Sequence, residues 1–280
     1  MPHVIILCGG QGTRLREESE YRPKPLVDIG GRPILWHIMK LYAHYGHHDF
    51  ALALGYKGNL IKEYFLNYEA MNNDFTIRLG SPNQIACHNA HGESDFTVTL
   101  ADTGQSEMTG ARLKRMEPYA GTGTCMVTYG DGVSDVDINA LLAFHHSHGK
   151  LATMTTVHPT SRFGVVNVGG DNRITDFTEK PKAAGWANAG FFVFEPGVFD
   201  YLSADPACVL EDEPLRKLAE DGQLMAYRHE GFFFAMDTYR EYLKLNELWS
   251  SGEAPWAVWT RAQSQAASPA VKQRIAVTAS

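Results

Sequence analysis

The stretch Val4-Ile5-Ile6-Leu7-Cys8-Gly9-Gly10-Gln11-Gly12-Thr13-Arg14-Leu15 decides the fold of this chain. Its four leading apolar residues predict a fully buried strand, and the glycines let the backbone turn sharply and expose its N–H groups. Arg14 follows the last glycine, and Arg22-Pro23-Lys24-Pro25 adds a second cation between prolines. A buried strand, a bare backbone and two cations make a cradle for an anion, and we expect a polyphosphate there.

The spacing of these residues disfavours two common phosphate-binding motifs. A P-loop has Lys followed by Ser or Thr directly after its last glycine, whereas Gly12 is followed by Thr13-Arg14. A dinucleotide fingerprint needs a glycine at the position of Leu15. A plain turn between a strand and a helix is an alternative for the glycines alone, but Arg14 and the Pro-Lys-Pro segment argue against it.

Composition bounds the class of protein. The chain has 280 residues, of which 44% are hydrophobic and 20% charged, as expected for a soluble globular protein. Its net charge of −7 disfavours a general nucleic-acid binder, although a local basic pocket remains compatible with it. The apolar run at the N-terminus is too short to cross a bilayer, so we expect no membrane partner.

Cysteine and histidine give little sign of a metal site. The four cysteines are far apart and form no C-x-x-C motif, which favours reduced thiols in the cytoplasm. Two histidine groupings invite a metal interpretation. We expect both to be solvated or locally hydrogen-bonded instead. The first combines Cys87-His88 with His91, and the second consists of His145, His146 and His148.

Apolar runs of strand length alternate with helical patterns along most of the chain. Strands are expected at 4–7, 50–54, 96–100, 125–129, 151–157 and 189–194, and helices at 33–45, 60–68, 111–117 and 138–148. Asp137 is the predicted N-cap of the last helix, and Gly149 marks its end. A hairpin is expected at 164–168 and 173–177, in a lobe packed on the same sheet. This alternation predicts an α/β fold with a Rossmann-like, mostly parallel mixed sheet and helices on both faces.

The segment Gly9 to Leu15, with the later Lys24-Pro25, resembles the signature of the sugar-1-phosphate nucleotidyltransferases, G-G-x-G-T-R-L followed by a lysine before proline. In detail the resemblance is strongest to the glucose-1-phosphate cytidylyltransferases and covers residues 1–258. Further matching segments follow in the family's order: 30–40, 55–58, Tyr129-Gly130-Asp131-Gly132, Glu179-Lys180-Pro181, 190–193 and Met236-Asp237-Thr238.

The resemblance implies the nucleotide-diphospho-sugar transferase fold. It suggests one domain over residues 1–259, with the nucleotide in the N-terminal half and the sugar in the C-terminal half. Residues 260–280 are rich in Ala, Ser, Gln and Thr and are expected to form a weakly ordered tail. The resemblance also implies a homo-oligomer, and a role in nucleotide-sugar and polysaccharide biosynthesis.

The implied activity is Mg²⁺-dependent transfer of a cytidylyl group from CTP to a sugar 1-phosphate, with glucose 1-phosphate as the first candidate, giving a CDP-sugar and pyrophosphate. No side-chain nucleophile is needed, because the attacking phosphate is already ionised and the reaction depends on positioning and cations. Alternatives are another phosphorylated acceptor, another NTP, a non-catalytic nucleotide-sugar-binding protein, and a Rossmann oxidoreductase, which the glycine spacing disfavours.

Asp131 is a candidate metal ligand on its position alone. It directly follows a buried strand, at the edge of the sheet where α/β proteins bind ligands, and a carboxylate there suits Mg²⁺. An aspartate serving only a Gly-Asp-Gly turn is the alternative. The resemblance pairs Asp131 with Asp237 as metal ligands; Asp237 is also expected to begin a helix.

The resemblance assigns the remaining site residues. Arg14 and Lys24 are the catalytic cations, and Lys24 is expected to face solvent. For Arg112 the alternative is an exposed basic helix face shared with Lys114 and Arg115. The nucleotide-binding set is Leu7, Gly9, Gly10, Gly12, Thr13, Arg14, Lys24, Arg112 and Asp131, and the sugar-binding set is Glu179, Lys180 and Asn188.

Several positions depart from the family pattern. Cys8 stands where alanine is usual, and Ala189 replaces a glycine beside Asn188. Trp186 and Phe233 are large residues expected to shape the wall of the sugar pocket. These departures leave the cations in place and concern the identity of the sugar.

Overall fold

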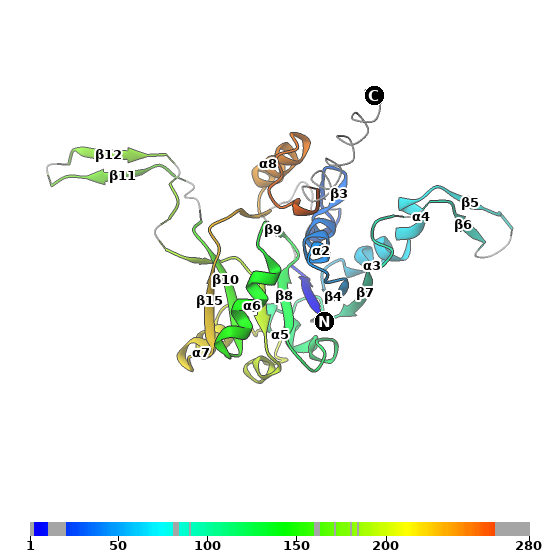
Figure 1. Cartoon of the computed structure of the whole chain (residues 1–280), viewed down its shortest axis with the longest axis horizontal. Helices are drawn as coiled ribbons and strands as arrows, with labels where there is room; N and C mark the ends of the chain where they lie inside the picture. Colours follow the sequence, from blue (N-terminus) through cyan, green and yellow to red (C-terminus); the bar gives the residue numbers. More distant parts are fainter. Residues whose placement is uncertain are drawn as a thin grey trace, which may run out of the picture.

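A computed structural model describes residues 3–10, 21–80, 84–89, 91–159, 163–170, 172–179, 181–183 and 185–260 (Figure 1). Its centre is an eight-stranded sheet. Strands β7, β4, β1 and β8 lie side by side and parallel, β14 is antiparallel to β8, and β10 pairs antiparallel with β14 and β13 and parallel with β15. The strands are β1 (Val4–Cys8), β4 (Asp49–Leu54), β7 (Thr97–Asp102), β8 (Cys125–Tyr129), β10 (Ala152–Val157), β13 (Ala187–Asn188), β14 (Phe192–Phe194) and β15 (Leu224–Arg228).

Strand β1 is apolar at every position, so both faces of the sheet need to be covered. Helices cover both of them. Val4 and Ile6 pack into one hydrophobic cluster with α2, α3, α6 and α8. Ile5 and Leu7 point the other way, into a second cluster with α5, α7 and η3. The helices are α2 (Ile34–His44), α3 (Gly58–Leu66), α4 (Tyr68–Asn72), α5 (Thr109–Arg115), α6 (Ile138–His148), α7 (Glu213–Glu220) and α8 (Tyr239–Ser250), with 3₁₀ turns η1 (Lys24–Leu26), η2 (Glu117–Tyr119) and η3 (Pro196–Tyr201).

The predicted fold class is confirmed, and several predicted elements agree closely with the structure. β1 and β8 cover the expected residues, with β1 extended by Cys8. Helix α6 has the predicted caps: the Asp137 side chain accepts from Ala140 N, and Gly149 adopts φ 63°. The strand predicted at 189–194 is wrong in its first half, because Gly190 and Phe191 have positive φ values of 74° and 45° and separate β13 from β14.

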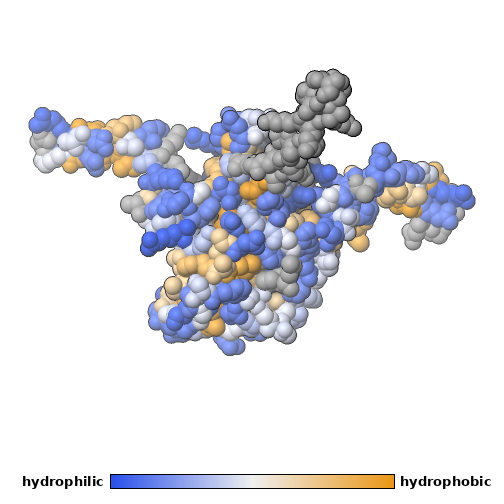
Figure 2. All heavy atoms as spheres, viewed as in Figure 1, coloured by the Kyte–Doolittle hydropathy of each residue, from blue (hydrophilic) through white to orange (hydrophobic). Residues whose placement is uncertain are grey.

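Two hairpins leave the body of the molecule as arms. The first arm is β5 (Phe75–Ile77) with β6 (Ile85–Cys87), and the second is β11 (Val165–Val168) with β12 (Ile174–Thr178). Each forms a two-stranded sheet of its own, and Figure 1 shows them projecting on opposite sides. The hairpin at 164–177 is thus confirmed, but its expected packing on the central sheet is wrong. Apolar residues on both arms are exposed, as Figure 2 shows.

Two further strand pairs are short. They are β2 (Asp28–Ile29) with β3 (Arg32–Pro33), and β9 (Gly132–Ser134) with β16 (Phe233–Ala235). The second pair matters for the site, since it brings residues 131 and 236 together: Met236 N donates to Asp131 O at 2.9 Å. The expected tail lies outside the described residues apart from Thr260. Among the described residues, no helix is both long and apolar enough to span a membrane.

Candidate active site

A cavity of about 500 Å³ opens at the carboxyl ends of β1 and β8. This is where ligands bind in open α/β sheets, as the sequence predicted. The cavity is lined by every described residue that the sequence assigned to the nucleotide. It is lined by Leu7, Cys8, Gly9, Gly10, Lys24, Pro25, residues 105–109, Arg112, Tyr129, Gly130 and Asp131.

Two glycines are needed here because the chain packs closely around them. A Cβ on Gly9 would lie 2.0 Å from Cζ of Arg112. A Cβ on Gly130 would lie 3.0 Å from the carbonyl oxygen of Leu7, which accepts from Gly130 N at 3.0 Å. By contrast, a Cβ on Gly10 would meet no described atom within 4 Å, so nothing in the described part of the chain packs on the backbone there.

Arg112 forms the buried wall of the cavity. Only 3% of its surface is exposed, so the alternative of an exposed helix face is wrong for Arg112. Its Nη1 donates to the carbonyl oxygens of Leu54 and Gly104, both at 2.8 Å, and to Thr103 Oγ1 at 2.7 Å. Its Nη2 donates to the carbonyl oxygen of Glu107 at 2.8 Å. Arg112 therefore joins β4, the segment after β7 and the start of α5.

Lys24 lies between two carboxylates. Its Nζ is 2.6 Å from Oδ2 of Asp131 and 2.7 Å from Oδ1 of Asp237. The expectation that Lys24 faces solvent is wrong, since 11% of its side chain is exposed. Burial alone would lower the pKa of Lys24, but the charges and hydrogen bonds of Asp131 and Asp237 outweigh it and hold the pKa above its ordinary value.

Distant parts of the chain bring these carboxylates together. Asp131 ends the turn after β8, and Asp237 directly precedes Thr238, the N-cap of α8. Glu241 Oε2 accepts from the backbone N–H groups of Asp237 and Thr238, both at 2.8 Å. The N-terminus of α8 is thereby fixed. Asp237 is at the start of a helix, as expected.

The sugar-assigned residues are split between the sheet and the second arm. Asn188 lies in β13, and its Nδ2 donates to the hydroxyl of Tyr129 at 3.2 Å, which connects it to the cavity. Glu179 is exposed and lies one residue beyond β12, on the second arm. Arg14, Gly12, Thr13 and Lys180 lie outside the described residues.

A family model described as nucleotidyl transferase matches residues 3–232. The chain belongs to the nucleotidyl transferase family. This nucleotidyl transferase is 48% identical over 258 residues to a glucose-1-phosphate cytidylyltransferase of Salmonella typhimurium, covering 91% of this chain and 99% of the relative. It is 43% identical to a probable glucose-1-phosphate cytidylyltransferase of Bacillus subtilis, covering 91% of this chain and 99% of the relative. Enzymes of this family generally use a divalent metal ion.

Solved structures share the fold of this nucleotidyl transferase. HddC from Yersinia pseudotuberculosis superposes with a TM-score of 0.65 at 22% identity, covering 89% of this chain and all of that one. A structure named as a putative glucose-1-phosphate thymidylyltransferase from Bacillus anthracis gives a TM-score of 0.63 at 18% identity, over 88% of this chain and 94% of that one. At these identities the likeness shows the fold, and the site depends on the residues described above.

The chemistry of Asp131 and Asp237 fits a divalent cation. Both are hard oxygen ligands, and about a third of each side chain is exposed at the site, at 32% and 35%. Two carboxylates together with substrate phosphates are a usual ligand set for Mg²⁺. The ammonium group of Lys24 already lies between the two carboxylates, so this pair of side chains holds a positive charge between them.

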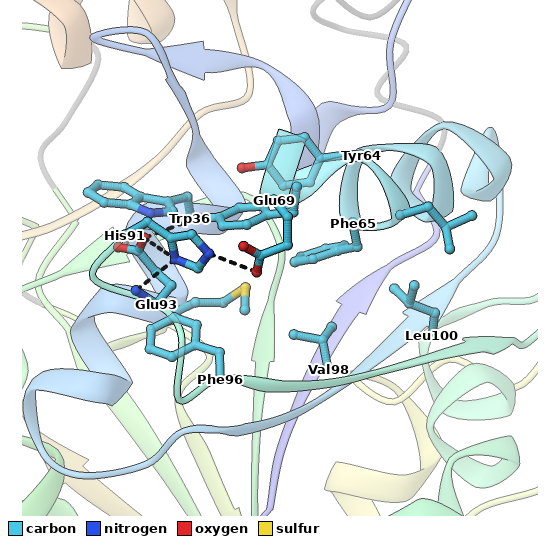
Figure 3. A pocket seen from close by; sticks show the side chains of 12 residues that line it. Trp36, Tyr64, Phe65, Glu69, His91, Glu93, Phe96, Val98 and Leu100 are labelled. Carbon is cyan, nitrogen blue, oxygen red and sulfur yellow. Dashed lines mark hydrogen bonds and ion pairs between the residues drawn. The ribbon is translucent and has the colours of Figure 1, made fainter. Parts of the chain in front are cut away.

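The histidine groupings behave as locally bonded side chains, as predicted. His91 Nε2 contacts Glu69 Oε1 at 2.8 Å, and its Nδ1 accepts from Glu93 N at 3.2 Å, in a largely apolar pocket (Figure 3). His145 and His148 both contact Thr153 Oγ1, at 2.8 and 2.7 Å. Within the described parts of the chain, no group of three or more His, Cys, Asp or Glu residues could hold a metal ion.

Trp186 and Phe233 are placed differently from each other. The Trp186 ring lies 3.9 Å, centroid to centroid, from that of His158, and the Arg228 guanidinium is 5.7 Å from it. Trp186 therefore packs against His158 and Arg228, with its ring tilted by 38° to that of His158. Phe233 in β16 pairs with Ser134 in β9. It also lies next to Gly132, the residue that directly follows Asp131 in the chain.

The sequence reasoning missed roles for Tyr129 and Glu211. Tyr129 precedes Gly130-Asp131 and lines the cavity, and its hydroxyl donates to Glu211. The motif containing Tyr129 was a signal that could have drawn attention to its side chain. Glu211 carries no such signal, because only the folded chain brings it to β8.

Proposed function

We propose that this nucleotidyl transferase moves a cytidylyl group from CTP to a sugar 1-phosphate, with glucose 1-phosphate as the first candidate, and releases pyrophosphate. The observation that carries the proposal is the cluster of Lys24 with Asp131 and Asp237, because Lys24 and Asp131 line a cavity of about 500 Å³. The two relatives at 48% and 43% identity, both named for this reaction and matched over nearly their full length, support the choice of substrates.

In the proposed reaction, an oxygen of the sugar phosphate attacks the α-phosphorus of CTP. A new P–O bond forms while the bond from the α-phosphorus to the bridging oxygen of pyrophosphate breaks. The electron pair leaves with pyrophosphate, and no proton transfer is required. The demand on the protein is to hold two anions in line and to stabilise the charge that moves between them.

Each assigned residue has a part in holding these anions. Arg14 and Lys24 are assigned to neutralise the triphosphate, and the backbone from Leu7 to Gly10 is assigned to contact the nucleotide. Gly12 and Thr13 belong to the same nucleotide-binding set. Arg112 supports the backbone at Gly9, since its side chain holds the surrounding backbone. Asp131 and Asp237 would hold Mg²⁺, which supplies further neutralisation of phosphate charge when bound.

The sugar phosphate is assigned to the C-terminal half of one domain covering residues 1–259. Glu179 is assigned to the sugar hydroxyls and Lys180 to the phosphate of the sugar, and Asn188, at the edge of the central sheet, is assigned to the sugar as well. Phe233, next to the turn of Asp131, is placed to shape the wall of this pocket. Trp186, which packs against His158 and Arg228, is assigned to the same wall.

The proposal includes a homo-oligomer in the cytoplasm. Two-stranded ribbons are marginal in water on their own, and the arms expose Ile77, Val168 and Phe177 by 50–60%. A second copy covering these arms would remove that surface from water. All four cysteines are free, which supports a reducing compartment. Light scattering that gives the mass of a monomer would contradict the oligomer.

The test of the proposed reaction is release of pyrophosphate from a panel of NTPs and sugar 1-phosphates. We expect turnover with CTP and glucose 1-phosphate, dependent on Mg²⁺ and lost on treatment with a chelator. Lys24→Met, purified in the same way, controls for contaminating enzymes. Turnover only with another NTP or acceptor would change the substrates assigned to this nucleotidyl transferase. No turnover with any pair would contradict the proposal that the protein is an active enzyme.

A further inference from the structure

A chain of hydrogen bonds crosses the site from the nucleotide wall to the sugar side. Its centre is the carboxylate of Glu211, which accepts from the hydroxyl of Tyr129 through Oε1 and from the hydroxyl of Thr109 through Oε2. Tyr129 and Thr109 both line the nucleotide cavity. Asn188, on the sugar side, donates to the same Tyr129 hydroxyl at 3.2 Å.

The direction of each hydrogen bond follows from donors that cannot change. Gly190 N can only donate, and it lies 2.8 Å from Asn188 Oδ1, so the amide nitrogen of Asn188 faces Tyr129. The Tyr129 oxygen accepts from that nitrogen, so its single proton goes to Glu211.

The segment that carries Glu211 also holds the start of α5. The carbonyl oxygen of Cys208 accepts from the backbone N–H groups of Gly110 and Ala111, at 3.0 and 3.1 Å. Leu210 N donates to Thr109 Oγ1 at 3.0 Å. Segment 208–211 thereby joins the start of the helix that carries Arg112 to the end of β8.

We infer that Glu211 is a positioning residue for the acceptor substrate. It touches neither substrate; it fixes the Tyr129 hydroxyl, which in turn fixes the amide of Asn188. With its oxygen held by Gly190 and one N–H held by Tyr129, Asn188 offers its second N–H in a set direction. This inference rests on the proposed assignment of Asn188 to the sugar phosphate.

The test compares Glu211→Ala, Tyr129→Phe and the double variant, with CTP and glucose 1-phosphate as substrates. Each single change should raise the KM for glucose 1-phosphate by about ten-fold, the scale of one lost hydrogen bond to a fixed partner. The KM for CTP and kcat should stay within about two-fold. Because Glu211 acts through Tyr129, the double variant should be no worse than the worse single variant.

Two further variants separate positioning from simple stability. Glu211→Gln keeps an acceptor for the Tyr129 proton and should restore most of the wild-type KM. Glu213→Ala, two positions later at the start of α7, removes an exposed glutamate that pairs with Lys217. It should change neither KM. If Glu211→Ala does not fold, Tyr129→Phe and Glu211→Gln still give the comparison. Equal rises in both KM values, or losses that multiply in the double variant, would overturn the inference.

A measurement without turnover keeps the inference separate from the proposed function. The side-chain amide resonances of Asn188 in ¹⁵N-labelled protein should shift in Glu211→Ala and in Tyr129→Phe, and stay in place in Glu213→Ala. If wild-type protein shows no turnover but these shifts occur, the reaction is wrong and the positioning of Asn188 stands. Unchanged Asn188 resonances in Glu211→Ala would refute the positioning even in an active enzyme.

Discussion

Trp256 donates its indole N–H to Nδ1 of His37 at 3.2 Å, across 219 positions of sequence. His37 Nε2 lies 2.9 Å from the carbonyl oxygen of Ile29, so the imidazole is neutral, with its proton on Nε2. The side chain is fully buried and packs edge-on against Trp36 and Trp249. This contact attaches the last described segment of the chain, which contains Trp256, to α2 near the turn at Gly30 and Gly31.

Acid should destabilise the protein through His37. Burial lowers the pKa of His37 to about 4, against a value of 6.5 in the unfolded chain. Between these values the unfolded chain binds a proton that the folded protein does not, so stability is full above pH 6.5 and falls as the pH drops toward 4. The loss should reach about 3 kcal/mol in the free energy of unfolding.

Urea unfolding between pH 8 and pH 4 measures this effect. His37→Leu should be less stable than wild type at pH 8 and should lose the part of the pH dependence between 6.5 and 4. His44→Leu, at the exposed end of the same helix, controls for removal of a histidine. If His37→Leu and wild type fall in parallel over this range, the buried imidazole is not the cause.

Lys24 should compete with the metal ion in the protein without nucleotide. Its ammonium lies between the two carboxylates that are proposed to hold Mg²⁺. Lys24→Met should therefore bind Mn²⁺ more tightly, by about ten-fold, because one positive charge no longer repels the ion. The same variant should lose about two to four powers of ten in kcat/KM, since a placed charge no longer stabilises the transferring phosphate.

Titration calorimetry with Mn²⁺ measures the first effect, and pyrophosphate release the second. Lys62→Met is a matched control, because Lys62 pairs with a single exposed carboxylate, that of Asp102, at 2.6 Å. Unchanged or weaker Mn²⁺ binding in Lys24→Met would show that the lysine and the ion do not share these carboxylates.

The sequence predicted the parts of this fold that depend on local signals. β1 is continuously apolar, and the Asp137 and Gly149 caps fix α6, so neighbouring residues were enough. It also placed Asp131 at the correct edge of the sheet. It could not predict that Lys24 is enclosed, because the two carboxylates that enclose it lie 107 and 213 positions away.

The remaining errors have similar physical causes. Arg112 has the sequence context of an exposed basic helix, and its burial depends on carbonyl groups of three other segments. The second arm has the alternation of a half-buried hairpin, but no third strand or helix covers it within the described part of this chain. A pattern of apolar side chains predicts a surface to be covered and does not say what covers it.

Arg112 should be needed for both stability and nucleotide binding. Lysine at this position has one nitrogen in place of the guanidinium, so Arg112→Lys could not hold the partly buried carbonyl oxygens of both Gly104 and Glu107. We expect a loss of at least about 2 kcal/mol in the free energy of unfolding and weaker binding of CTP. Urea unfolding and CTP titration check both. Arg115→Lys, which can keep its pair with Glu107, is the control, and an Arg112→Lys protein as stable as this control would refute the prediction.

The nucleotide base should be cytosine, held at the glycine-turn end of the sheet. Leu7, Cys8, Gly9 and Gly10 line the cavity, and we expect their backbone groups to contact the edge of a pyrimidine. A site that hydrogen-bonds an exocyclic amine strongly rejects a carbonyl in its place. Binding titrations should rank CTP above UTP and the purine nucleotides. Equal or tighter binding of UTP or dTTP would overturn the cytidylyl assignment and leave the transferase standing.

Glu179 should act on the acceptor and not on the nucleotide, although it lies on the second arm. Glu179→Ala removes contacts to sugar hydroxyls and leaves the residues around Lys24 unchanged, so the KM for glucose 1-phosphate should rise by about ten-fold or more while the KM for CTP stays constant. Asp176→Ala is a matched control, because Asp176 is an exposed acid in β12, three positions before Glu179 on the same arm. If Glu179→Ala raises the KM of both substrates equally, or if Asp176→Ala has the same effect, Glu179 only stabilises the second arm. The assignment of Glu179 to the sugar is then wrong.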